Sequence, residues 1–488
     1  MLALVRLGSQ PLRLDEARTA LLADAVRATG LPRDTSEGPS LFPSSELAPN
    51  GLCVLHTPLQ FYLAALGRAV KPTPFATRLP FVLVAIAGVW GAVALADRLS
   101  PGAGVYTGLL LLQVPVLLLL RQARYYPVVF AARVFALWSL FLDQMWMAAL
   151  AGLLLAAAEW SGYLATLAAS VAGAVFGAWS FVEVAGLSSG ICIVLVWAWL
   201  RRDVEAPVPL HKNFVDGFLE SFWTYFWKLH CAFAPIIPIA IAVLLVSASI
   251  PIEVVAGLGW IVLAHLGLRS VTPVLFTRYL TPAVAPAAIA MGLALQAIAE
   301  RSTALAVVLA ALTAATNALH IGPLTLLPPR VVRRVAFLRC PGGSHLAREA
   351  PEDLDRRIRV LQVDFVRELV KPPMTRSGEL ARWLPAGSTV LIGHTEAATL
   401  QVAGPHLRVV PWGVRKSLER EHLARRPPDF VVLGDLDRPF AALNGDRADY
   451  ELRVVSAPDV LLGNGETPER HVFRDDQVPW GVEVHARC

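Results

Sequence analysis

The chain has 488 residues, of which 55% are hydrophobic and only 17% are charged, and its formal net charge is +5. Soluble globular chains carry roughly 25% charged residues, and the mean hydropathy here is +0.54. This composition excludes a disordered chain, a coiled coil and a small disulfide-stapled module. The low net charge gives no indication of nucleic-acid binding. The composition indicates a membrane protein with several spans.

The chain divides into two parts by charge. Residues 326–488 hold more than half of the charged residues, so we expect a transmembrane domain at 1–325 and a soluble α/β domain at 326–488. The polar stretch 7–77 comes first and is predicted to be an external loop. Its helix candidates are 14–29 and 59–70, each with ordinary start or stop residues, such as Gly30 after the first.

Long apolar runs follow this loop, and they predict about ten spans between 79 and 320. We place them near 79–97, 104–120, 127–142, 145–160, 163–182, 184–200, 233–250, 252–268, 280–298 and 303–320. The segment 201–232 mixes aromatic and charged residues, which is typical of a helix lying at the membrane interface.

The part after residue 326 has the pattern of a small, doubly wound α/β domain, because runs rich in Val, Leu and Ile alternate with polar helices. Strands are expected at 388–393, 407–412, 430–434 and 450–456, and helices near 352–370, 376–384 and 416–425.

Two motifs lie in the first loop. Asp15 and Glu16 open the 14–29 helix, where they can act as a base and an orienting group or simply favour the helix N-terminus. His56 precedes Pro58 at the start of the second helix, and it is either a ligand for an anion or an ordinary loop histidine.

Two further motifs lie between apolar runs. Arg121 and Arg124 stand in the turn RQARYYP, and Arg278 opens the segment RYLTPAVAP. Arginines in such turns often mark one side of the membrane. They can also clamp a phosphate, because a guanidinium matches a phosphate with two parallel hydrogen bonds.

Taken in order, four segments resemble the GT-C membrane glycosyltransferases: RLGSQPLRLDEARTALLADAVRATG, HTPLQFYLAAL, RQARYYP and RYLTPAVAP. The resemblance is to the family 39 type, which includes protein O-mannosyltransferases and the aminoarabinose lipid A transferases. It covers about residues 1–300. The tail segments PPMTRSGELARWL and PPDFVVLGD are similar to the soluble domain of bacterial members.

The resemblance implies a polytopic helical GT-C fold and transfer of a hexose or pentose from a polyprenyl-phosphate donor. The acceptor is a lipid, a glycan or a protein on the extracytoplasmic face of a bacterial inner membrane. The implied catalytic pair is Asp15 and Glu16, with Asp15 as general base. The implied donor-phosphate ligands are His56, Arg121, Arg124 and Arg278, and the implied substrate contacts are Tyr125, Tyr126 and Tyr279.

The chemistry agrees with this reading. A phosphate leaves as a stable anion, so one base and several cations suffice, and the sequence contains no cluster of metal ligands; we expect no cofactor and inversion in a single step. Three departures are notable: Thr57 replaces a proline of the family motif, RQARYYP has no acidic residue beside its arginines, and the span expected before Asp15 is reduced to the stub 1–5. We expect DNA upstream of Met1 to encode that span.

Two other functions remain open. A transporter or flippase for lipid-linked or anionic substrates would also be polytopic, although no inverted repeat is visible in the sequence. A non-catalytic scaffold for envelope assembly is the third possibility.

Overall fold

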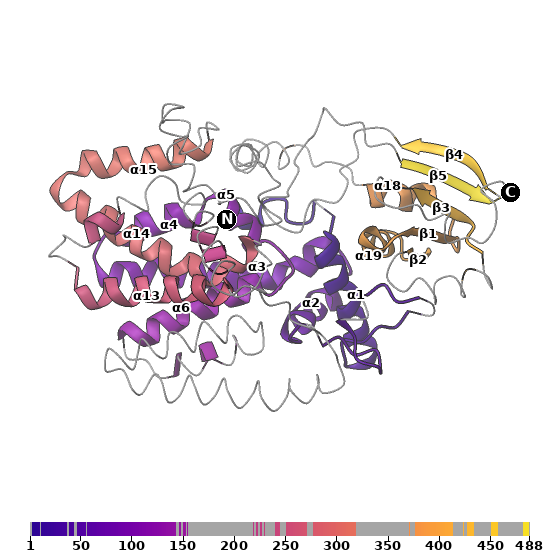
Figure 1. Ribbon diagram of the computed structural model, residues 1–488, viewed down its shortest axis with the longest axis horizontal. Helices are drawn as coiled ribbons and strands as arrows, with labels where there is room; N and C mark the ends of the chain where they lie inside the picture. Colours follow the sequence, from indigo (N-terminus) through magenta and orange to yellow (C-terminus); the bar gives the residue numbers. More distant parts are fainter. Residues whose placement is uncertain are drawn as a thin grey trace.

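The computed structural model describes residues 2–9, 11–36, 39–42, 46–54, 56–142, 250–270, 277–318, 376–412, 427–433, 450–456 and 482–487, with scattered positions at 146–154, 218–244, 370 and 423. Figure 1 shows a helical part and a β-sheet part at opposite ends of the long axis. Two helices, α1 (Leu14–Thr29) and α2 (Leu59–Val70), lie between them. Both helices have the bounds predicted from the sequence.

Helix α1 follows a short 3-10 turn, η1 (Leu2–Leu4). Its first turn carries Asp15 and Glu16, where the helix dipole favours negative charge. The N–H of Arg13 donates to Oε2 of Glu16 at 3.1 Å and so satisfies a backbone group at the N-terminus. Gly30 ends the helix with a φ of 79°, the left-handed conformation that glycine adopts easily.

Helix α2 packs between α1 and α3 (Pro74–Leu99). Arg68 near the end of α2 donates from Nε to Oδ1 of Asp24 in α1 at 2.9 Å. The same guanidinium donates from Nη1 to Oγ1 of Thr77 in α3 at 3.1 Å. One arginine thus ties three helices together.

Three helices among the described residues are long and apolar enough to cross a membrane: α3, α13 (Ile252–Arg269) and α14 (Thr281–Arg301). The apolar helices α6 (Tyr126–Leu142) and α15 (Thr303–Ala318) are shorter. The span predicted at 104–120 is divided into α4 (Ala103–Leu111) and α5 (Val114–Leu120). Pro115 explains the break, because proline has no N–H with which to continue the helix.

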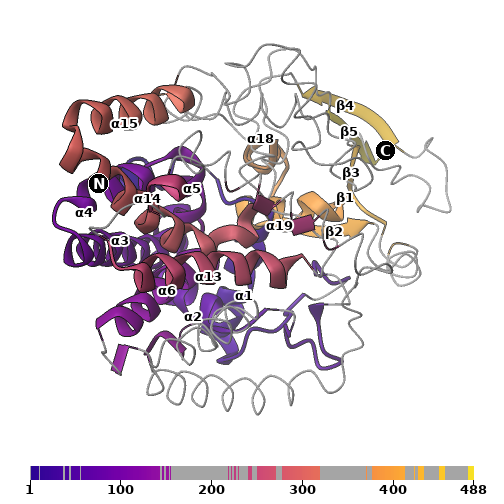
Figure 2. The same cartoon turned by 60° about the vertical axis from the view of Figure 1, so that its left-hand side comes forward.

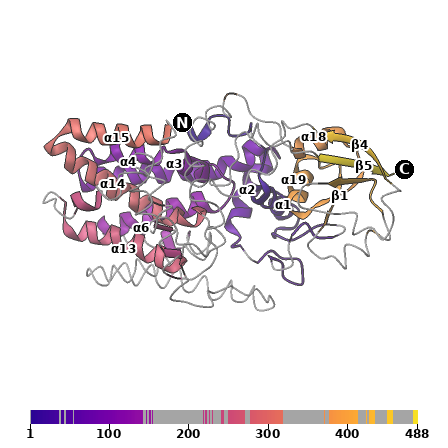
Figure 3. The ribbon, with the colours of Figure 1, turned by 45° about the horizontal axis from the view of Figure 1, so that its top comes forward.

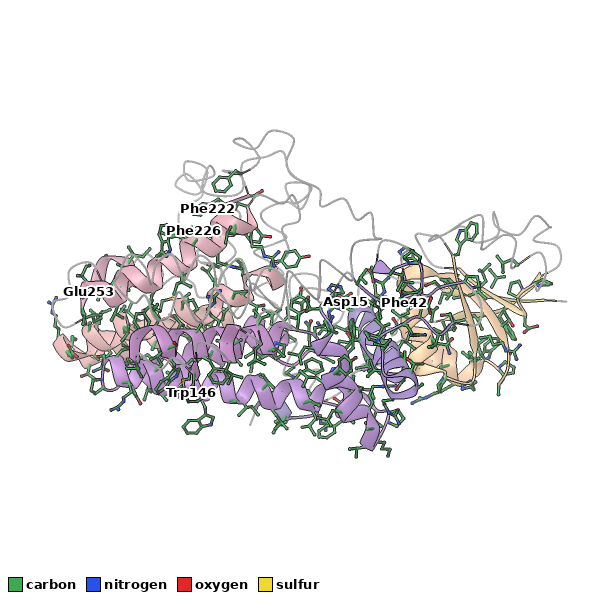
Figure 4. All side chains as sticks on the ribbon, turned by 90° about the horizontal axis from the view of Figure 1, so that it is seen from below. Asp15, Phe42, Trp146, Phe222, Phe226 and Glu253 are labelled. Carbon is green, nitrogen blue, oxygen red and sulfur yellow. The ribbon has the colours of Figure 1, made fainter. Side chains whose placement is uncertain are left out.

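Small residues let these helices approach closely. A Cβ added to Gly88 of α3 would lie 2.9 Å from Cα of Ala131 in α6. A Cβ added to Gly292 of α14 would lie 2.9 Å from the carbonyl oxygen of Ala103 in α4. Large apolar side chains instead cover the outside: Trp90 and Trp146 are mostly exposed, and Figure 4 shows Trp146 pointing away from the helices. This distribution is typical of helices that pack within a membrane.

The sheet has five strands in the order β2-β1-β3-β5-β4. The strands are β1 (Thr389–Gly393), β2 (Arg408–Trp412), β3 (Phe430–Leu433), β4 (Tyr450–Ser456) and β5 (Val482–Arg487). The first three are parallel, and β5 is antiparallel to both β3 and β4. The four predicted strands are confirmed to within a residue. The sheet is mixed, because the unpredicted β5 lies between β3 and β4 and is antiparallel to both.

Helices α18 (Arg376–Trp383) and α19 (His394–Ala403) accompany the sheet. Figure 2 shows both on the side of the sheet toward the helical part. Ala17 and Ala20 of α1 pack with Ala398 of α19 in one buried cluster. The sheet part is therefore joined to the helix that carries the Asp-Glu pair, and Figure 3 shows the same contact from another side.

Several predictions fall wholly or largely outside the described residues. These are the spans 145–160, 163–182, 184–200 and 233–250, the interfacial segment 201–232, and the helices 352–370 and 416–425.

Candidate active site

Three segments far apart in the sequence meet at the guanidinium of Arg124. Its Nη2 lies 3.5 Å from Oδ2 of Asp15 at the start of α1. The same nitrogen lies 3.3 Å from Nε2 of His56, just before α2. Since an arginine N–H can only donate, His56 accepts through Nε2 in this arrangement. The structure thus brings together one predicted base and two predicted phosphate ligands. The side chain of Arg124 is almost completely buried, whereas that of Asp15 is 13% exposed.

Glu16 faces away from this cluster and into the protein. Its side chain is 1% exposed, and its carboxylate accepts from Nε of Arg78 at 2.7 Å and from Nη2 of Arg78 at 2.6 Å. The N–H of Ala123 donates to Oε1 at 2.9 Å, beside the 3.1 Å bond from Arg13. Burial raises the pKa of Glu16, but the charge and hydrogen bonds of Arg78, helped by Ala123, hold that pKa below its ordinary value.

Arg78 is a residue that the motif search did not select. Besides binding Glu16, it donates from Nη1 to the carbonyl of Leu7 at 3.0 Å and from Nη2 to that of Pro11 at 2.8 Å. It therefore fixes the segment before α1 to the first turns of α3. The signal that could have found it is its place at the head of the first apolar run, where an unpaired buried arginine would be costly.

The two arginines of RQARYYP have different surroundings. Arg121 is 8% exposed and donates from Nη2 to the carbonyl of Val5 at 2.8 Å. Arg124 contacts Asp15 and His56, as described above. Arg124 therefore contacts two other predicted site residues, while Arg121 binds the backbone of the segment before α1.

The two tyrosines that follow are buried beside the cluster. The ring of Tyr125 lies 6.0 Å from that of His56 and 4.4 Å from that of Tyr126, measured between centroids. The guanidinium carbon of Arg124 lies 5.5 Å from the Tyr125 centroid, within the range of a cation–π contact. These rings form an aromatic wall behind the two cationic side chains.

The RYLTP motif meets helix α13. Its first residues form a 3-10 turn, η4 (Thr277–Leu280). The guanidinium carbon of Arg269 lies 4.3 Å from the ring centroid of Tyr279, whose carbonyl oxygen is 2.6 Å from Nε2 of His265. Arg278 lies in the same turn, but its side chain is outside the described residues.

Three neutral polar side chains, close in sequence to His56 or Arg124, were not among the predicted site residues. Thr57, Gln60 and Gln122 are buried, and Oγ1 of Thr57, both amide atoms of Gln60 and Nε2 of Gln122 have no hydrogen-bond partner among the described residues. Thr57 adjoins His56, and Gln122 stands two positions before Arg124. The signal in the sequence is a glutamine on the buried stripe of α2, in line with Ala64 and Arg68. Buried polar atoms of this kind need partners, so they are ready to bind a polar ligand.

Metal ligands do not cluster here: no three His, Cys, Asp or Glu side chains gather within the part of the chain that the structure describes.

The helical part and the sheet part together have a fold shared with solved structures of a protein of the kind that the motifs predicted. The structures that show this are of ArnT from Cupriavidus metallidurans. Its apo state aligns with a TM-score of 0.60 at 16% identity, and its complex with undecaprenyl phosphate aligns with a TM-score of 0.59 at 14% identity. Each alignment covers 99% of this chain and 96% of ArnT. No family model and no curated protein matches the chain.

Proposed function

We propose that this protein is a membrane glycosyltransferase that moves a sugar from a polyprenyl-phosphate donor to an acceptor. The observation that carries the proposal is the cluster of Asp15, Arg124 and His56 in a fold shared with ArnT, which was crystallised with undecaprenyl phosphate. The partly exposed carboxylate of Asp15 can accept a proton, and the side chains of Arg124 and His56 can bind a phosphate. These are the groups that transfer from a glycosyl phosphate requires.

The proposed reaction is a single displacement. Asp15 takes the proton of the acceptor hydroxyl or amine while the acceptor atom forms a bond to the anomeric carbon. The bond from that carbon to the phosphate oxygen breaks, and the polyprenyl phosphate leaves with the electron pair. Arg124 and His56 stabilise the negative charge of the departing phosphate. The configuration at the anomeric carbon inverts, and no redox step or cofactor is involved.

Glu16 has a positioning role in this proposal. Its bonds to Arg78 and to the N–H of Ala123 tie the start of α1 to the RQARYYP turn. The tie fixes the separation of Asp15 and Arg124, which stand next to the two anchored points. Arg121 supports the same turn. Arg278, in the RYLTP motif, is proposed as a further ligand of the donor phosphate.

The remaining polar and aromatic groups are proposed to hold the sugar. Thr57, Gln60 and Gln122 offer hydroxyl and amide groups, which pair with sugar hydroxyls as both donors and acceptors. Tyr125, Tyr126 and Tyr279 offer rings against which a sugar can lie. Neutral groups suit this task because they discriminate between hydroxyl patterns without repelling the nearby phosphate.

The site is proposed to face the extracytoplasmic side of a bacterial inner membrane, with residues 326–488 as a soluble domain on that side. The partners are then the lipid-linked donor, membrane lipid and a lipid, glycan or protein acceptor. The apolar helices and the large apolar side chains on their outer surface support an integral membrane protein.

Asp15→Asn tests the proposal. Purified protein is given undecaprenyl phosphate carrying a radiolabelled hexose or pentose together with candidate acceptors, and transfer is measured. We expect wild-type protein to transfer the sugar and Asp15→Asn to be slower by about 10²–10⁴-fold, the usual worth of a general base.

Asp97→Asn is the matched control. Asp97 caps the amides of Gly102 and Gly104 at the other end of α3, and an asparagine oxygen can keep both bonds. Its transfer rate should equal that of wild type. If Asp15→Asn is as fast as wild type, Asp15 is only a helix-terminal acid. If wild-type protein instead moves labelled lipid across a bilayer without forming a new bond, the protein is a transporter.

A further inference from the structure

A groove lies where the end of α1 meets the edge of the sheet. Its volume is about 530 Å³, within the range of roughly 300–1,000 Å³ that is common for small-molecule sites. The side chains that matter below are Asp24, Arg33, Asp34, Phe42, Gln401 and Arg408, all of which line it. Figure 4 labels Phe42 at the boundary between the helices and the sheet. We call this the junction groove.

The junction groove is separate from the candidate active site. Asp24 lies nine residues after Asp15 on the same helix, so the two are about 13 Å apart at 1.5 Å per residue. The lining of the groove does not include Asp15, His56 or Arg124. A ligand in this groove is therefore a second ligand, beyond the donor site proposed above.

Both walls of the groove are ordered by their own hydrogen bonds. On the loop side, the N–H of Asp34 donates to the carbonyl of Gly51 at 2.8 Å, and Oδ1 of Asp34 accepts from the N–H of Ser36 at 3.0 Å. Below them, Phe42 belongs to the same buried cluster as Leu407 and Val409 of the sheet part. The groove is thus built from two parts that pack on one another.

The edge of the sheet is closed to an added strand. Strand β2 is the outermost strand, and its free edge borders the groove. Gln401 of α19 already occupies that edge: its Nε2 donates to the carbonyl of Leu407 at 3.1 Å, and its Oε1 accepts from the N–H of Val409 at 3.2 Å. A peptide could not pair there without displacing Gln401. A compact ligand fits the groove better.

The charges of the groove favour an anion. Asp24 is neutralised by Arg68, which donates to both of its oxygens. Asp34 is engaged by Ser36. Arg33 comes from the loop and Arg408 from the edge strand, and neither forms an ion pair within the described residues. Asp34 keeps its charge, but the two guanidiniums that line opposite walls outweigh it, so the groove carries a net positive charge.

We propose that the junction groove binds a phosphate-bearing, hydroxylated ligand. Arg33 and Arg408 hold the phosphate through their paired N–H groups. Phe42 provides an apolar surface for the attached ring or chain, and Thr389 and Ser36 lie in the lining to meet hydroxyl groups. This chemistry is shared by a lipid head group and a soluble sugar phosphate, and the experiment below separates them.

The test measures binding of glucose 1-phosphate to the full chain in detergent by titration calorimetry. An Arg124→Ala background removes binding at the candidate active site. We expect binding of glucose 1-phosphate but not of glucose. Arg33→Gln and Arg408→Gln should each weaken the binding of glucose 1-phosphate by about tenfold, the usual effect of losing a charge-assisted hydrogen bond. Arg408→Lys should recover only part of the loss, because lysine has no fork.

Arg27→Gln is the matched control. Arg27 is another exposed arginine, which shares Asp24 with Arg68 through a 3.4 Å ion pair, but it does not line the groove. Both target arginines are exposed, so their substitution should leave the unfolding temperature unchanged.

A second arm separates the two sources of phosphate. Protein in phosphatidylcholine nanodiscs, with or without phosphatidylglycerol, is analysed for retained anionic lipid. Retention that depends on Arg33 and Arg408, without binding of glucose 1-phosphate, identifies a lipid head group. The proposal is overturned if neither glucose 1-phosphate nor phosphatidylglycerol binds. It is also overturned if Arg33→Gln and Arg408→Gln bind as tightly as wild type, or if Arg27→Gln loses as much affinity as these two variants.

Discussion

Replacing Glu16 by glutamine tests whether this residue acts on substrate or holds the site together. Each carboxylate oxygen accepts two hydrogen bonds: Oε1 from Nε of Arg78 and the N–H of Ala123, and Oε2 from Nη2 of Arg78 and the N–H of Arg13. All four partners are donors. The new amide NH₂ must therefore face two donors, whichever oxygen it replaces, and Arg78 is left with its charge buried.

The magnitude follows from this burial. The side chains of Glu16 and Arg78 are 1% and 6% exposed, so solvent cannot replace the lost charge. Removing one partner of a buried ion pair lowers the unfolding free energy by about 3–5 kcal/mol. We therefore expect Glu16→Gln to unfold at a clearly lower denaturant concentration than wild type. Sugar transfer should fall in parallel, because the turn that carries Arg124 loses its anchor at Ala123.

The assay is denaturant unfolding in detergent, followed by retention on size exclusion, beside transfer measurements on the folded fraction. A double variant, Glu16→Gln with Arg78→Met, removes the buried charge and should cost less than the sum of its single substitutions. A Glu16→Gln protein as stable as wild type but slow in transfer would refute the reasoning, since Glu16 would then act on substrate.

Four further outcomes are expected. The folded pKa of Glu16 lies below its ordinary value of 4.5, so its ion pair stabilises the fold fully above pH 4.5 and is lost as the pH falls through the folded pKa. The unfolding free energy of Glu16→Gln should therefore depend less on pH below 4.5 than that of wild type. Arg124→Ala should raise the KM for donor, and Arg124→Lys should restore only part of the affinity. Gly292→Ala should destabilise by about 1–3 kcal/mol through overpacking against α4, whereas Gly259→Ala, with nothing within 4 Å, should not. An impermeant maleimide should label Cys488 in intact cells, and labelling only after lysis would place the C-terminus inside.

Much of the helical architecture could be predicted from local sequence. The bounds of α1 and α2 follow from their start residues, their apolar faces and Gly30. The membrane helices follow from the length of the apolar runs, since a hydrocarbon layer requires a set span. Four strands follow from short runs rich in branched residues, but β5 was missed because Val-Glu-Val-His-Ala-Arg alternates with charged side chains and lacks such a run.

Only the tertiary structure shows which of the two carboxylates is buried. Asp15 and Glu16 are neighbours, and in an α-helix their side chains point about 100° apart. Their position at the start of one helix does not say which of the two side chains faces the protein. That depends on Arg78, which lies 62 positions away and pairs with Glu16, and on Arg124, which lies further still and meets Asp15. Periodicity records which face of one helix is apolar, but contacts between distant charges depend on how the helices pack.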